Sequence, residues 1–80
     1  MNKLLIEILK DSIEKEVFEY IVREYENVKE LSIFELGIDS LDYMKLLTKI
    51  EERLDLDIED LDKINTIYDI EGMIGKKWVR

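Results

Sequence analysis

Residues 35–44 read ELGIDSLDYM and mark the point at which a turn passes into a helix. Gly37 suits the turn because glycine adopts left-handed backbone conformations without steric cost. Asp39 suits the helix N-cap, where its carboxylate accepts a hydrogen bond from a backbone N–H of the first turn. The segment therefore predicts a helix that begins at about residue 40, with Ser40 at its tip.

The helix expected over about residues 40–54 has one apolar face. At about 3.6 residues per turn, its apolar side chains share an arc of about 100°, the width of a core-facing stripe. This core face consists of Tyr43, Leu46, Leu47, Ile50 and Leu54. The opposite face holds Leu41, Lys45, Thr48 and Glu52, and it is flanked by Met44, Lys49 and Glu51. We expect Leu41 and Met44 to be exposed beside Ser40, either as isolated surface hydrophobes or as a small docking surface.

The N-terminal third of the chain predicts a second helix. Apolar residues recur at every fourth position from Leu5 to Tyr25, which favours one helix over about residues 3–25. The alternative is a kink or break near Asp11, where the sequence DSIE resembles a capping box.

The remaining segments complete a single all-α domain over residues 1–80. Residues 26–39 are expected to form a connecting loop with Leu31, Phe34 and Leu36 turned inward. A one-turn helix is expected within residues 54–63. A last helix, capped by Asn65 or Thr66, is expected to end near Gly75.

Composition excludes several classes of function. The 80 residues include no cysteine, which excludes a disulfide, a thiolate zinc site and a cysteine nucleophile. They also include no histidine, the usual general base. The net charge of −8 argues against binding to nucleic acid or to an anionic membrane. The apolar run LLIEIL is interrupted by Glu7 and is too short for a signal peptide or a membrane span. We expect a cytoplasmic, monomeric protein without a metal site.

Ser40 has two interpretations at this point. It is either an ordinary residue of the first helical turn or a hydroxyl displayed for modification. A serine hydroxyl is a weak nucleophile without a neighbouring base, and this chain has no histidine, so Ser40 is not expected to be catalytic. It suits the acceptor of a group attached by another enzyme, because a helix N-terminus favours a phosphate ester.

Two longer stretches carry a family resemblance. LGIDSLDYMKLLTKIEERLDLDI, residues 36–58, followed by INTIYDIEGMI, residues 64–74, resembles an acyl or peptidyl carrier protein. The attachment signature of that family, Gly-x-Asp-Ser-Leu, is matched by Gly37, Ile38, Asp39, Ser40 and Leu41.

The resemblance implies a small right-handed four-helix bundle with one short helix. It implies that a phosphopantetheinyl transferase uses coenzyme A to place 4′-phosphopantetheine on Ser40, whose arm then holds an acyl or aminoacyl group as a thioester. Such a chain is not an enzyme. Asp39, Leu41, Asp42 and Met44 would form the surface around the arm, and a loading ligase and condensing or transfer enzymes would be its partners.

Two departures bear on the pathway. In fatty-acid carriers the exposed face of the corresponding helix is strongly acidic. Here residues 40–54 hold three acidic and three basic residues, and Lys45, Lys49 and Glu52 are expected on the exposed side. The segment LDLDIEDLDKI also lacks the proline often found after its isoleucine. We therefore expect a specialised pathway with an aminoacyl, aryl or polyketide-type cargo. The alternatives are a fatty-acid carrier and an unmodified helical adaptor.

A few other features have simple interpretations. The acidic run at Asp55, Asp57 and Glu59 lacks the glycine and the glutamate of a calcium-binding EF-hand. Core positions are expected for Ile58, Ile64 and Ile67, and packing roles for Phe18, Tyr20 and Tyr25. For Trp78 the sequence leaves open whether it packs on the bundle or lies in a frayed tail.

Overall fold

The structure, a computed structural model, describes residues 1–78 without the side chains of Ile58, Lys77 and Trp78. The chain folds into helices with short connections. Four helices have nine or more residues: α1 (Lys3–Ser12), α2 (Lys15–Arg23), α4 (Ser40–Leu54) and α6 (Ile67–Trp78). Three have four residues: α3 (Tyr25–Val28), the 3₁₀ helix η1 (Ile33–Leu36) and α5 (Ile58–Leu61). The predicted all-α fold class is confirmed.

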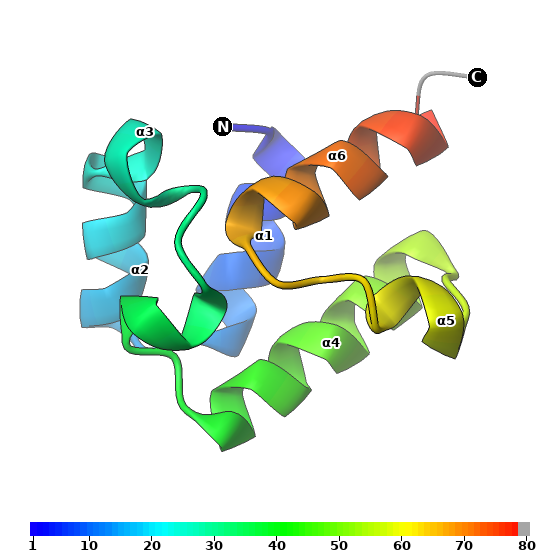
Figure 1. Ribbon diagram of the computed structural model, residues 1–80, viewed down its shortest axis with the longest axis horizontal. Coiled ribbons are helices and arrows are strands. Elements are labelled where there is room, and N and C mark those ends of the chain that lie inside the picture. Colours follow the sequence, from blue (N-terminus) through cyan, green and yellow to red (C-terminus); the bar gives the residue numbers. More distant parts are fainter. Residues whose placement is uncertain (79–80) are drawn as a thin grey trace.

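Helix α1 lies at the centre of the arrangement and contacts α2, α4 and α6 (Figure 1). Helix α4 runs along the lower edge in that view, and α6 lies above it. The beginning of α1 and the end of α6 are at the upper edge, whereas the first turn of α4 is at the lower edge (Figure 1). An ion pair of 3.1 Å between Arg53 and Glu7 joins α4 to α1 on the surface.

The expected single helix over residues 3–25 is wrong, because the chain breaks at Ile13 and Glu14. A spacing of four residues advances by about 400°, so an apolar stripe with that spacing rotates by about 40° at each step. Over twenty residues Leu5 and Tyr25 would face nearly opposite directions on one straight helix. The break lets both be buried, at 0% and 9% exposure. The capping box expected from Asp11 and Glu14 does not form, because Asp11 still lies within α1 and the N-cap of α2 is Glu14, which makes no side-chain cap hydrogen bond.

The segment over residues 26–39 is more regular than the expected loop, since it contains most of α3 and all of η1. The expectation that Leu31 and Phe34 turn inward is wrong: they are 38% and 56% exposed. Leu36 is buried as expected, together with Ile33 and Ile38, because the 3₁₀ repeat of about three residues aligns Ile33 with Leu36.

Two backbone hydrogen bonds fasten this segment to the beginning of α6. The Ile33 N–H donates to the Asn65 carbonyl at 2.9 Å, and the Tyr68 N–H donates to the Lys29 carbonyl at 3.1 Å. The sequence predicted Asn65 or Thr66 as the cap of the last helix, and Thr66 caps α6. Its hydroxyl accepts from the Asp69 N–H at 3.1 Å, and the Asp69 carboxylate accepts from the Thr66 N–H at 3.0 Å. Helix α6 continues to Trp78, beyond the expected end near Gly75.

The core confirms the face assigned to α4. Leu46, Ile50 and Leu54 are buried, and Tyr43 and Leu47 are partly buried against them. The remaining buried hydrophobic residues are Leu5, Ile8, Leu9, Ile13, Ile21, Tyr25, Val28, Ile33, Leu36, Ile38, Leu61, Ile64, Ile67, Ile70 and Ile74. Ile64 and Ile67 are thus core residues as expected, whereas the expectations for the side chains of Ile58 and Trp78 lie outside the described residues.

Three aromatic residues expected to pack differ in burial. Tyr25 is buried, Phe18 is partly buried, and Tyr20 is 38% exposed, with the Arg23 guanidinium 6.0 Å from its ring centroid. Within residues 1–78, none of the helices is long and apolar enough to span a bilayer. The described side chains include no group of three or more potential metal ligands.

Candidate functional site

The turn before α4 fixes where Ser40 lies. Gly37 has φ 94°, the left-handed conformation that favours glycine, and its N–H donates to the Phe34 carbonyl to close η1. The next residue, Ile38, is 2% exposed and anchors the connection in the core. Asp39 is extended and accepts from the Asp42 N–H at 2.9 Å through its carboxylate, so it is the N-cap predicted from the sequence. Ser40 follows as the first residue of α4.

Ser40 is the exposed serine of this chain. Of the other two, Ser12 is 3% exposed and donates to a backbone carbonyl, and Ser32 is partly buried in an isolated bridge with Thr66. Thr48 is exposed, but its hydroxyl donates to the Met44 carbonyl at 2.9 Å. We find no such hydrogen bond for the Ser40 hydroxyl among the described residues, so it is accessible and uncommitted.

The first turn of α4 suits a phosphate ester on Ser40. The first N–H groups of a helix have no partner within the helix, and the helix dipole is positive there. Asp39 occupies the N–H of Asp42, which leaves those of Ser40 and Leu41 for an anion. The chain supplies the oxygen of the ester and these two donors, and it would supply no thiol, since it has no cysteine.

Exposed apolar side chains follow Ser40 on α4. Leu41 is 75% exposed and Met44 is 60% exposed, as the helical periodicity predicted. The exposed Phe34 ring of η1 lies against the Tyr43 ring of α4, with centroids 5.0 Å apart.

Three of the five predicted partner residues, Met44, Lys45 and Lys49, line a shallow groove near Ser40, whereas Asp42 does not line it. The groove, called here the α4 groove, is lined by Asp11, Leu41, Met44, Lys45, Thr48 and Lys49. Lys45 approaches Asp42 at 3.9 Å, a long ion pair between an exposed lysine and a partly buried carboxylate. Glu52 is exposed on the same helix but does not line the groove.

Two residues of this site were missed by sequence reasoning. Asp11 reaches the groove from α1, and no spacing in the sequence relates it to Lys45 or Lys49. Phe34 was assigned to the core, although its position between Ile33 and Leu36 in a 3₁₀ turn leaves it outside. Finding Asp11 would have required the tertiary structure, and finding Phe34 would have required knowing that its turn is a 3₁₀ helix.

Comparison with known proteins agrees with this geometry. Residues 21–74 match the sequence model of the family described as phosphopantetheine attachment site. An acyl carrier protein of Syntrophus aciditrophicus is 40% identical over 73 residues, which cover 88% of this chain and 82% of that protein. One of Buchnera aphidicola subsp. Acyrthosiphon pisum is 34% identical over 73 residues, covering 86% and 91%. One of Bdellovibrio bacteriovorus is 43% identical over 47 residues, covering 56% and 60%. No solved structure matches the chain significantly.

A helical domain with this serine-tipped helix and this family match is a phosphopantetheine-binding carrier protein. Its prosthetic group is 4′-phosphopantetheine, which supplies the thiol for thioester chemistry. The chain belongs to the acyl carrier protein family. It accordingly works with enzymes that attach the prosthetic group and with acyl-transfer enzymes.

Proposed function

We propose that Ser40 is the attachment residue and that the chain carries cargo for other enzymes without being an enzyme itself. The supporting observation is that Ser40 is an exposed, uncommitted serine at the first position of α4. In the attachment step the Ser40 oxygen forms a phosphoester with the pantetheine phosphate of coenzyme A, and adenosine 3′,5′-bisphosphate leaves. The hydroxyl proton passes to the transferase, because this chain has no histidine to accept it.

Intact-mass spectrometry after treatment with coenzyme A and a broad-specificity transferase tests this assignment. The wild-type chain is expected to gain one phosphopantetheine group and Ser40→Ala none. Thr48→Ala is the control, since it removes another exposed hydroxyl from the same helix, and it should be modified like the wild type. Modification of Ser40→Ala would show that another residue is used. A wild-type chain that no transferase modifies would instead support an unmodified adaptor.

We further propose that the partner enzymes belong to a specialised pathway with an aminoacyl, aryl or polyketide-type cargo. The supporting observation is the charge of the exposed face of α4, where Lys45 and Lys49 line the groove beside Ser40. An enzyme built for an acidic helix presents cationic groups, which these lysines would repel. The second candidate is fatty-acid synthesis. It is favoured by the relatives, which are acyl carrier proteins.

Charge reversal separates the two candidates. Lys45→Glu with Lys49→Glu is expected to raise kcat/KM with a fatty-acid ketosynthase about two- to thirtyfold at low salt, where screening is weakest. Lys63→Glu with Lys76→Glu makes the same change in net charge away from the groove and should have a much smaller effect. Equal activity of all three proteins would show that Lys45 and Lys49 play no part in partner choice. High activity of the wild type with this enzyme would favour fatty-acid synthesis.

A further inference from the structure

Two aromatic rings meet where η1 lies against the beginning of α4. Phe34 on η1 is 56% exposed, and its ring packs on that of Tyr43, with the centroids 5.0 Å apart and the ring planes inclined at 53°. Aromatic side chains prefer tilted contacts at this separation. The two rings are called here the aromatic pair. More than half of Phe34 remains in solvent, so a group that covered it would gain the free energy of burying apolar surface.

The aromatic pair is held in place by contacts with the rest of the fold. Phe34 lies in η1 between Ile33 and Leu36, which are 1% and 5% exposed and fix this turn on the core. The Tyr43 hydroxyl donates a long hydrogen bond of 3.4 Å to the Ile64 carbonyl. A surface that is already ordered loses little conformational entropy when it is covered, which favours binding to it.

Helical geometry directs Tyr43 and Met44 toward Ser40. They follow Ser40 by three and four positions in α4, and residues with these spacings are neighbours on one face of a helix. Side chains of a helix also lean toward its N-terminus, so both extend toward the turn that carries Ser40. Met44 is 60% exposed. A group joined to Ser40 that turns back along α4 therefore meets Met44 and the aromatic pair.

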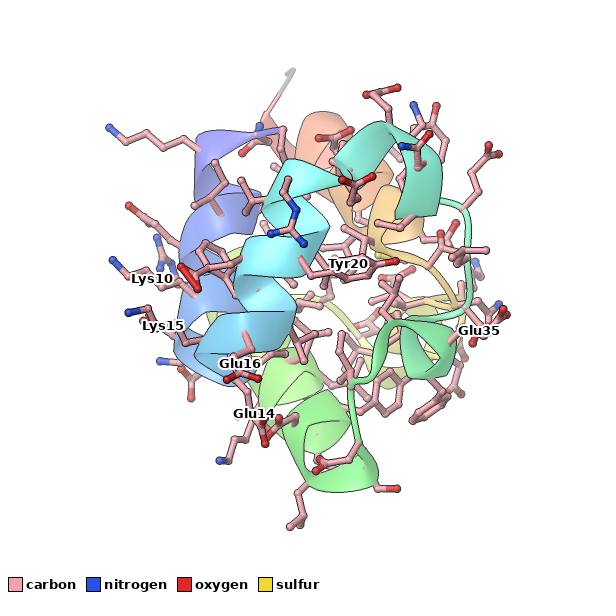
Figure 2. The ribbon with its side chains drawn as sticks, turned by 90° about the vertical axis from the view of Figure 1, so that its left-hand side faces the viewer. Lys10, Glu14, Lys15, Glu16, Tyr20 and Glu35 are labelled. Atoms are coloured by element: carbon pink, nitrogen blue, oxygen red, sulfur yellow. The ribbon has the colours of Figure 1, made fainter. Side chains whose placement is uncertain are left out.

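The chemistry of the prosthetic group suits this surface. Beyond its phosphate, 4′-phosphopantetheine is uncharged, and its dimethyl-substituted carbon is joined to the phosphate through a methylene group. The dimethyl group is thus the apolar part of the arm that lies nearest to Ser40 along the covalent chain. The acidic residue next to Phe34 does not oppose the phosphate from between the two helices, because Glu35 extends from η1 away from the first turns of α4 (Figure 2).

We propose that the phosphopantetheine arm on Ser40 rests on the aromatic pair in the free carrier, with its dimethyl group against the Phe34 and Tyr43 rings. Covalent attachment selects this occupant, because a group joined to Ser40 is held beside the rings at a high effective concentration, whereas a free ligand has to be recruited from solution. The competing site is the α4 groove, whose lining beyond Leu41 and Met44 is polar or charged. The proposal rests on Ser40 being the attachment residue.

Proton NMR of the modified chain tests the proposal. Protein whose mass shows one added arm is compared with coenzyme A. The dimethyl signals are expected to move upfield, because they would lie over aromatic rings, and to show nuclear Overhauser effects to ring protons of Phe34 and Tyr43. Phe34→Ala should lose most of this upfield shift. Phe34→Tyr keeps an exposed ring and should retain the shift. Because Phe34 is largely exposed, the alanine variant is expected to fold, which its amide spectrum before modification checks.

The matched control is Tyr68→Ala, which removes a ring of similar exposure, 50%, from α6 and should leave the dimethyl signals of the modified chain unchanged. Dimethyl signals at their coenzyme A positions, or an equal upfield shift in Phe34→Ala, would overturn the proposal. Nuclear Overhauser effects to Leu41 and Thr48 without any to Phe34 would place the arm in the α4 groove and would also overturn it. A chain that gains no arm refutes the proposed function and this proposal with it, whereas a modified chain with unshifted signals refutes this proposal alone.

Discussion

Three leucines of α4 provide a graded test of the packing. Leu46 is 0% exposed, Leu47 is partly buried against the core, and Leu41 is 75% exposed beside Ser40. Replacing Leu46 by alanine removes buried atoms and leaves a cavity, which costs about 2–5 kcal/mol. Leu47→Ala should cost about 1–2 kcal/mol, because solvent can fill part of the space. Leu41→Ala should change stability by less than about 0.5 kcal/mol.

Urea denaturation followed by far-ultraviolet circular dichroism measures this series. A domain of this size has a free energy of unfolding of about 4–12 kcal/mol, so Leu46→Ala loses a large part of it. If that variant is unfolded without urea, Ile50→Val is the milder probe of the same buried face and should cost about 0.5–1.5 kcal/mol. Similar midpoints for Leu41→Ala and Leu46→Ala, with unchanged m-values, would refute the orientation of α4 described here.

Three further substitutions test individual features. Burial, and secondarily the nearby Glu71 carboxylate, raise the pKa of the Tyr25 hydroxyl well above its ordinary value of about 10. Its neutral form therefore stabilises the fold below pH 10, and this stability is lost as the pH rises above 10, where the unfolded chain ionises first. The free energy of unfolding of Tyr25→Phe should be within about 1 kcal/mol of the wild type at neutral pH, because the buried hydroxyl has no hydrogen-bond partner among the described residues. The variant should lose less stability in alkali than the wild type does. Parallel profiles of stability against alkaline pH for the two proteins would contradict this. Gly37→Ala should cost about 1–2 kcal/mol through its left-handed conformation alone, since the new Cβ would lie at an ordinary contact distance of 3.8 Å from Val17. In α6, Gly72→Ala meets no neighbour and should stabilise the protein by about 0.5–1 kcal/mol. Thermal denaturation that ranks the two variants the other way would be evidence against the turn.

The sequence was most informative where local chemistry decides the structure. Asp39 caps α4 and Thr66 caps α6 because a short oxygen-bearing side chain binds the free N–H groups of the turn that follows it. The exposed position of Leu41 follows from helical periodicity in the same way. These local rules were sufficient to place Ser40 at the tip of an exposed helix.

The sequence was misleading where the outcome depends on long-range packing. The four-residue spacing over residues 3–25 identified most of the buried side chains but missed Ile8. It also gave one helix in place of two, because the direction of the core changes along the chain. Phe34 is apolar, yet it packs on the surface against Tyr43, a contact between residues nine positions apart that no local pattern specifies. The contribution of Asp11 to the α4 groove likewise depends on how α1 and α4 cross.

The positions of the chain ends affect how this domain can be tethered. The beginning of α1 and the end of the described part of α6 lie at one edge of the molecule, and the first turn of α4 lies at the opposite edge (Figure 1). A linker, an affinity tag or an immobilising surface that joins the domain before α1 or after the described part of α6 would therefore begin on the side of the molecule away from the first turn of α4. The domain could be anchored by one end and still swing its serine toward several enzymes in turn, with the linker length setting the local concentration that each enzyme experiences.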